Sequence, residues 1–243
     1  MAYYQEHFTL TAAETDLHWR MKVSSILRRL QDIAGHHIDS LGMTRDILIA
    51  RGQVFLLSKV EVTIHRSPRV NEKVILKTRP HPAKGVYFIR ESLLCSEEGE
   101  TLVSAASAWI LADPENHSVL RPNAFDWGAY RFDEVDFDPS VARRRIKAPE
   151  RVTQLGQRII RFTDLDGNGH VNNAVYGDIL CDFLPAEQML ARPIRSFAIH
   201  YEHEAKLGET LSITGAHCED GSFILLGQRD GERCFSAQVT FDE

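Results

Sequence analysis

A polar segment at residues 164–173 carries the residue types that acid–base chemistry needs. Asp166, Asn168 and His170 are spaced by two, with glycines between them. An extended backbone would point all three side chains to one side, and the glycines would let a ligand approach closely. We therefore expect the three side chains to converge on one small site.

A helix is expected directly after this segment, over residues 171–184, because apolar residues recur there every three or four positions. The first turn of a helix has unpaired N–H groups and a partial positive charge. Both features would favour an oxyanion nearby and disfavour a charged imidazole. We therefore expect His170 to be neutral near pH 7.

The same residues also have a purely structural interpretation. Asp, Asn and Gly are common in turns, so Asp166 and Asn168 could be turn and helix-capping residues, with His170 half-buried at the helix start. We expect Asn172 and Asn173 to satisfy backbone groups and leave them out of the catalytic set. Spacing alone does not choose between the structural and the catalytic interpretation.

Other segments give little support for metal or cofactor chemistry. Residues 199–204 include His200 and His203, but strand alternation sends these two to opposite faces, and His-Glu-x-x-His is absent. The sequence also lacks the Gly-x-Ser-x-Gly of serine hydrolases and the Gly-x-x-x-x-Gly-Lys of phosphate-binding loops. We therefore expect neither a metal nor a cofactor.

The helices and strands predicted around the polar segment form a repeat. The first half predicts a helix over 23–37 and strands over 54–65, 73–79, 86–95 and 102–111. The second half predicts the helix over 171–184 and strands over 194–203, 210–218, 222–229 and 233–241. This common order indicates a duplicated unit.

Two direct matches between the halves support the duplication. Residues 66–76 match residues 203–213 in character, and residues 16–25 match residues 164–173 in frame. The segment 16–25 lacks the Asp/Asn/His set. Because a feature that the fold requires would appear in both copies, the set is expected to serve function.

The duplication divides the 243 residues into two strand-rich units. We expect an N-terminal unit at 1–125, a linker at 126–152 and a C-terminal unit at 153–243. The linker includes an acidic run at 133–138 and a basic run at 143–147, which we interpret as a solvated face rather than a docking site for an acidic partner. One long amphipathic helix packed on an antiparallel sheet in each unit is an α+β design.

Composition disfavours several classes of protein. Lys and Arg number 28 against 34 Asp and Glu, so a net charge of −6 offers nucleic acid no attraction. The four cysteines include no Cys-x-x-Cys pair and are expected to be reduced core thiols. No export signal opens the sequence, and no apolar run approaches the roughly 18 residues that span a bilayer. We therefore expect a cytoplasmic protein without membrane insertion.

Two segments resemble a known enzyme family. Residues 164–176, Asp-Leu-Asp-Gly-Asn-Gly-His-Val-Asn-Asn-Ala-Val-Tyr, closely resemble the signature of hot-dog-fold thioesterases, and their Asp-x-Asn-x-His pattern resembles the acyl-acyl carrier protein thioesterases. Residues 201–205, Tyr-Glu-His-Glu-Ala, look like the family's second active-site segment. The resemblance covers essentially the whole chain. It implies a tandem double hot-dog, each unit an antiparallel sheet wrapped around a central helix, with the acyl-chain pocket in the first unit and catalysis in the second.

The resemblance implies that Asp166, Asn168, His170 and Glu204 are the catalytic residues. Glu204 would act as general base on a water, and Asn168 with helix-start N–H groups would stabilise the oxyanion. His170 would align the water or the carbonyl, and Asp166 would orient His170 and Asn168. Plant members commonly have Cys directly after this Glu, but Ala205 stands here, which excludes a cysteine nucleophile at that place.

The implied activity is hydrolysis of acyl-acyl carrier protein to free fatty acid, which terminates fatty acid synthesis. The implied partner is an acyl carrier protein that bears a phosphopantetheine-linked acyl chain. Alternatives are an acyl-CoA thioesterase on the same fold and a non-catalytic acyl-binding protein; a hydratase fits less well, because those enzymes resemble Asp-x-Asn-Pro-x-His. The sequence leaves open the acyl-chain length and whether two chains form a homodimer.

Overall fold

The computed structural model describes residues 3–133 and 137–242. The described residues form two compact units. Unit 1 comprises Met1–Met21, Arg29–Val60 and His65–Arg144, and unit 2 comprises Lys22–Arg28, Glu61–Ile64 and Arg145–Glu243. The first long helix and the second strand therefore contribute residues to both units.

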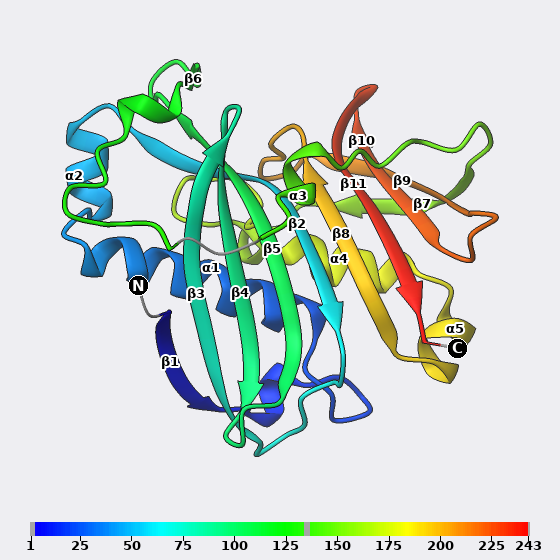
Figure 1. Ribbon diagram of the computed structural model, residues 1–243. Coiled ribbons are helices and arrows are strands. Elements are labelled where there is room, and N and C mark those ends of the chain that lie inside the picture. The colour runs from blue at the N-terminus through cyan, green and yellow to red at the C-terminus, as the bar shows by residue number, and fades with distance from the viewer. Residues whose placement is uncertain (1–2, 134–136, 243) are drawn as a thin grey trace. The chain divides into compact units, whose positions relative to one another are not determined.

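Unit 1 is an antiparallel sheet with one long helix against it (Figure 1). Its strands are β1 (Tyr4–Thr9), β2 (Val54–Ile64), β3 (Lys73–Lys84), β4 (Tyr87–Ser96), β5 (Thr101–Ala112) and β6 (Val119–Leu120). Its helices are α1 (Val23–Ser40), α2 (Arg45–Ala50) and α3 (Ser140–Arg143), with 3₁₀ turns at Ala12–Glu14 and Pro122–Ala124. The strand order is β1-β3-β4-β5-β2, and β6 pairs with β5.

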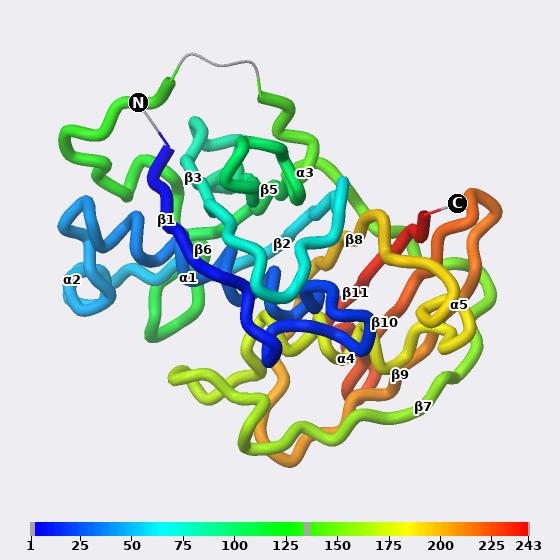
Figure 2. Tube along the Cα trace, turned by 90° about the horizontal axis from the view of Figure 1, so that it is seen from below, coloured from blue at the N-terminus to red at the C-terminus, as the bar shows by residue number. Residues whose placement is uncertain are grey.

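Unit 2 repeats this design with fewer residues. Its strands are β7 (Thr153–Ile159), β8 (Ile194–Tyr201), β9 (Thr210–His217), β10 (Phe223–Arg229) and β11 (Glu232–Phe241). Its helices are α4 (Val175–Phe183) and α5 (Ala186–Ala191), with a 3₁₀ turn at Phe162–Asp164. The antiparallel strands follow the order β8-β11-β10-β9-β7, which Figure 2 shows from below.

The predicted helices and strands are present, and the structure adds short elements that the periodicity did not reveal. The additions include β1, β7, α2 and α5, each of six or seven residues. The strand predicted to end at residue 79 continues to Lys84 through Pro80 and Pro82. Because β1 pairs with β3 only as far as Thr78, one side of β3 has no recorded strand partner beyond that point, and a proline without an N–H can lie there.

The segment predicted as a linker, 126–152, contains the short helix α3. Residues 134–136 of the acidic run lie outside the described residues. In the basic run, Arg143 pairs with Asp138 at 3.2 Å, and Ile146 is buried against the sheet of unit 2. The domain boundaries given above stay a prediction.

No helix among the described residues is long and apolar enough to cross a membrane.

A buried polar cluster lies between α1 and the sheet of unit 1. The Nη1 atom of Arg90 donates to Nδ1 of His37 at 3.1 Å and to Oγ1 of Thr78 at 3.2 Å. The imidazole of His37 stacks on Tyr4 and meets Tyr130 edge-on. Burial, together with the charge of Arg90, lowers the pKa of His37 to about 4, so this histidine is neutral in the folded protein near pH 7.

We expect this histidine to make the folded protein less stable as the pH falls from about 6.5 towards 4. In that range the unfolded state binds a proton at His37 that the folded state does not bind, so the free energy of unfolding decreases with falling pH. Urea unfolding at a series of pH values should show a larger loss for the parent protein than for His37→Gln. Parallel pH dependences for the two proteins would contradict this assignment.

Candidate active site

The structure brings His170 and Glu204 together. The Nε2 atom of His170 lies 3.0 Å from Oε2 of Glu204, and the two side chains are 22% and 38% exposed. His170 lies in the loop before α4, and Glu204 lies in the loop between β8 and β9. An imidazole and a carboxylate thus meet where water can reach both.

Backbone pairing fixes the contact between these two loops. His170 forms an isolated β-bridge with Lys206, and the N–H of Val171 donates to the carbonyl of Ala205 at 3.0 Å. Val171 and Ala205, which directly follow His170 and Glu204, are therefore hydrogen-bonded to each other. Backbone pairing of the two loops therefore holds the His170 and Glu204 side chains near each other.

A tight turn holds the other two candidates. The N–H of Asp166 donates to the carbonyl of His170 at 2.9 Å, and Gly169, with φ of +79°, donates to the carbonyl of Asp166 at 3.0 Å. The Asp166 carboxylate accepts the backbone N–H of Asn168 at 2.8 Å and its side-chain N–H at 3.4 Å. The structure therefore pairs Asp166 with Asn168, and it connects Asp166 to His170 through the backbone.

Helix α4 begins at Val175 and not at Val171, where the apolar pattern placed it. The Asn172 side chain accepts the N–H of Ala174, and the Asn172 carbonyl accepts the N–H of Val175, both at 2.9 Å. Residues 172–174 therefore turn before the helix starts. The expectation that Asn172 satisfies backbone groups is confirmed. The N–H groups of Ala174 and Val175 already have partners, so we do not assign them to an oxyanion.

Two tyrosines to which the sequence assigned no role pack beside the loop that carries His170. The hydroxyl of Tyr201 donates to the carbonyl of Asn173 at 3.1 Å. The ring of Tyr176 meets Tyr201 and Phe235 edge-on, at centroid distances of 5.5 and 5.0 Å. Burial raises the pKa of both phenols, which stay neutral. Both tyrosines lie inside the matched motifs, but only the packing shows what they support.

Arg229 holds the loop that carries Glu204. From the end of β10, its Nη1 atom donates to the backbone carbonyl of Glu204 at 3.0 Å and to Oε2 of Glu209 at 2.8 Å. Glu209 in turn accepts the N–H of Lys206 at 2.8 Å. No motif or periodicity pointed to this arginine, because it lies in a segment distant in sequence from the loop that it contacts.

Unit 1 contains the same turn with other side chains. The N–H of Asp16 donates to the carbonyl of Arg20 at 2.8 Å, and Arg20 forms a β-bridge with Arg69. These bonds make Asp16 the counterpart of Asp166 in the repeat, whereas the sequence comparison matched Asp16 with Asp164. That match was wrong by two positions, because it aligned two Asp-Leu pairs and the turn is defined by its backbone bonds.

The corrected match separates structural from site-specific residues. Asp16 and Asp166 both accept backbone N–H groups of their own turns, so this carboxylate has a structural role in each unit. The counterparts of Asn168 and His170 are His18 and Arg20, and the counterpart of Glu204 is Ser67. The set of an amide, an imidazole and a second carboxylate is therefore found in unit 2 and not at the matching positions of unit 1.

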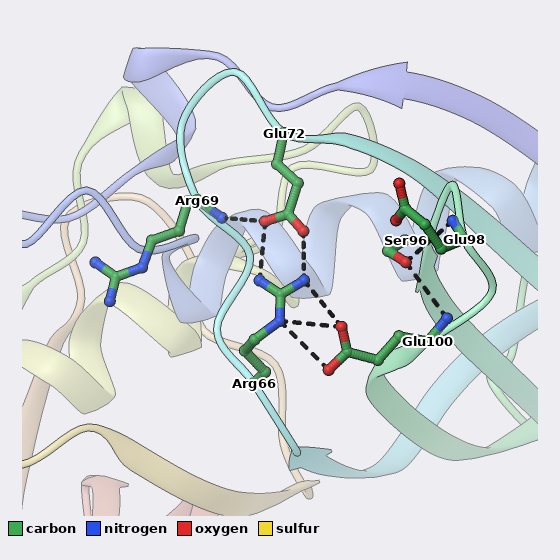
Figure 3. Close-up of polar contacts among 6 residues, drawn as sticks. All are labelled: Arg66, Arg69, Glu72, Ser96, Glu98 and Glu100. Carbon is green, nitrogen blue, oxygen red and sulfur yellow. Dashed lines mark hydrogen bonds and ion pairs between the residues drawn. The ribbon is translucent and has the colours of Figure 1, made fainter.

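The loop of unit 1 is held by its own ion pairs (Figure 3). Glu72 accepts the N–H of Arg69 at 2.8 Å, as Glu209 accepts that of Lys206. The guanidinium of Arg66 binds Glu72 at 2.6 Å and Glu100 at 3.3 Å. Both loops thus use a carboxylate at the same place, which agrees with the predicted match of residues 66–76 with 203–213.

No set of three or more His, Cys, Asp and Glu side chains is arranged to hold a metal ion within the part of the chain that the structure describes.

Both halves of the chain match models of known protein families. Residues 1–122 match the acyl-ACP thioesterase N-terminal domain, and residues 148–243 match the acyl-ACP thioesterase C-terminal domain. Individual curated relatives share about a fifth of their aligned residues with this chain. A palmitoyl-acyl carrier protein thioesterase from Arabidopsis thaliana is 21% identical over 92% of this chain and 58% of its own length. An acyl-[acyl-carrier-protein] hydrolase from Cuphea viscosissima is 22% identical over 83% of this chain and 52% of its own length. The chain thus spans about half the length of these relatives.

Solved structures share the fold over nearly the whole chain. An acyl-ACP thioesterase from Bacteroides thetaiotaomicron has a TM-score of 0.85 and 21% identity, covering 99% of this chain and 98% of its own. A 12:0-ACP thioesterase from Umbellularia californica has a TM-score of 0.83 and 18% identity, covering 99% and 97%. The predicted α+β double hot-dog fold is confirmed.

Proposed function

The chain belongs to the acyl-ACP thioesterase family, whose models match both of its halves, and we propose that it hydrolyses acyl-acyl carrier protein to free fatty acid. The observation that carries the proposal is the contact of 3.0 Å between His170 and Glu204, in a loop pair whose counterpart in unit 1 has Arg20 and Ser67. The reaction would release finished chains and so terminate fatty acid synthesis.

In the proposed mechanism, Glu204 takes a proton from a water while the water oxygen attacks the thioester carbonyl. His170, in contact with Glu204, orients that water. The amide of Asn168, held by Asp166, donates to the oxyanion of the tetrahedral intermediate. When the intermediate collapses, the C–S bond breaks and the thiol leaves with the proton from Glu204. A thiol with a pKa of about 8.5 is a good leaving group and needs little further acid catalysis.

The proposed partner is an acyl carrier protein with a phosphopantetheine-linked chain, and the proposed compartment is the cytoplasm. None of the four cysteines forms a disulfide in the described part of the chain, which suits a reducing compartment. The residue directly after Glu204 is the fully buried Ala205, which has no nucleophilic group, so a water is the nucleophile in this proposal. The acyl-chain pocket in the N-terminal unit stays a prediction.

Thiol release from matched series of acyl-carrier proteins and acyl-CoAs of increasing chain length tests the proposal. We expect faster hydrolysis of the carrier-protein series and its loss in a Glu204→Gln control. Preference for acyl-CoA would instead establish the CoA thioesterase alternative. Binding of acyl chains without thiol release from either series would contradict hydrolysis and support an acyl-binding protein.

We expect Arg229→Gln to lower kcat about tenfold, because a displaced carbonyl at Glu204 moves the general base relative to the thioester. The effect should fall on kcat more than on KM, and Arg229→Lys should restore part of it by keeping a cation beside Glu209. The matched control is Arg66→Gln, which removes the cation bound to Glu72, the counterpart of Glu209 in unit 1. Equal losses in the Arg229 and Arg66 variants would show a general effect on stability rather than positioning.

A further inference from the structure

Two large apolar side chains are exposed on the two loops that carry the proposed catalytic pair, His170 and Glu204. Phe162 is 80% exposed, more than any other large hydrophobic residue among those described, and Leu207 is 57% exposed. Arg161 and Lys206, which precede them in the sequence, are also exposed. We call these four residues the loop surface. Exposed aromatic and aliphatic side chains flanked by charges are typical of protein interfaces.

Backbone bonds connect the loop surface to the site. The N–H of Ile160 donates to the carbonyl of Glu209 at 2.9 Å, and Gly208 donates back to Ile160 at 3.0 Å. Phe162 follows this connection, and Leu207 lies next to Lys206, which bridges His170. The apolar side chains and the catalytic pair are therefore carried by the same two loops.

Comparison with unit 1 shows that the turn does not require these apolar residues. By the corrected match, Ala12 stands where unit 2 has Phe162, and Thr11 stands where it has Arg161. The half-buried Val70 stands where unit 2 has the exposed Leu207. The same backbone thus forms without an exposed phenylalanine or leucine at these places.

The cations of the loop surface are available to a partner. Neither Arg161 nor Lys206 takes part in an ion pair recorded for the described residues, whereas the nearby Arg158 and Arg229 pair with Asp164 and Glu209. Both cations are exposed to solvent in a chain whose net charge is −6. They would attract an acidic surface and repel a basic one.

We propose that Phe162 and Leu207, flanked by Arg161 and Lys206, dock an acidic carrier protein whose prosthetic arm then reaches His170 and Glu204. The inference rests on the proposed function and adds the surface that recognises the carrier. A nucleotide carrier such as CoA offers phosphates to the cations but no protein surface to two apolar side chains. The pairing of apolar and basic side chains therefore favours a protein as the occupant.

Two substrates with the same acyl thioester separate docking from chemistry. Acyl-carrier protein offers the full partner, and acyl-pantetheine offers the thioester without a protein. In Phe162→Ala/Leu207→Ala protein we expect KM for acyl-carrier protein to rise about tenfold or more, with kcat within twofold, because interface anchors contribute to binding. The kcat/KM for acyl-pantetheine should not change.

The turn of unit 1 supplies the matched control. Leu17 and Trp19 are 72% and 59% exposed, so Leu17→Ala/Trp19→Ala removes a similar amount of exposed apolar surface from the loop without Glu204 and His170. This control should leave both substrates unaffected. An equal rise in KM for the control variant would overturn the assignment to the loop surface.

Charge reversal tests the second half of the proposal. Arg161→Glu/Lys206→Glu should raise KM for acyl-carrier protein, and this effect should shrink at high salt because ions screen exposed charges. An unchanged KM in both docking variants overturns the proposal, as does an equal loss on acyl-pantetheine. Unchanged KM with lost binding to anionic phospholipid vesicles would assign the surface to a membrane instead. A parent protein that hydrolyses neither thioester contradicts the proposed function itself, which is a different result.

Discussion

Replacing Glu204 with Gln is expected to lower kcat for thioester hydrolysis by about 10²-fold or more. The amide has nearly the shape of the carboxylate but cannot take a proton from water. The side chain is 38% exposed, so the substitution leaves no buried group without a partner and the fold should be intact. The change therefore removes the proposed base and little else.

Glu202→Gln is the matched control for this variant. Glu202 lies two residues earlier, is exposed, and accepts a hydrogen bond from Ser236 at 2.8 Å, but it is not one of the candidates. Initial rates at saturating acyl-carrier protein should be near those of the parent for Glu202→Gln and strongly reduced for Glu204→Gln. Circular dichroism would verify that both fold. Near-parent rates from folded Glu204→Gln would discard the assignment of Glu204 as general base.

His170→Ala is expected to lower kcat by a similar factor of about 10². The substitution removes the nitrogen that lies 3.0 Å from the Glu204 carboxylate, and in the proposed mechanism it leaves the attacking water without its second partner. The backbone bonds of the turn, from Asp166 to His170 and from Val171 to Ala205, do not involve the imidazole. The loss should therefore appear as lost turnover rather than lost folding.

His203→Ala is the control, because His203 is exposed in the same region and its Nδ1 atom bonds the carbonyl of Arg233 at 2.7 Å. A double variant of His170→Ala and Glu204→Gln adds a sharper test. Groups that act as a unit give a double variant little worse than either single variant. A double loss equal to the product of the two single losses would show that the residues act independently.

Local patterns in the amino-acid sequence were enough to predict the repeated α+β design and to single out a candidate site. The helical stripe in α1 and the alternation in strands such as β9 are local patterns with a period set by backbone geometry, so they are readable without tertiary structure. The candidates Asp166, Asn168 and His170 also lie within one short segment. Local spacing identified that segment as a candidate without choosing between a structural and a catalytic role, and the resemblance to the thioesterases added Glu204.

Only the structure showed how those residues meet. It placed His170 against Glu204, moved the start of α4 to Val175 and paired Asp166 with Asn168. It also brought Arg229 to the carbonyl of Glu204. Each of these facts depends on hydrogen bonds between loops or on the competition between a side chain and the backbone for one N–H group. Such choices are settled only when distant segments pack together, because no period in the sequence records them.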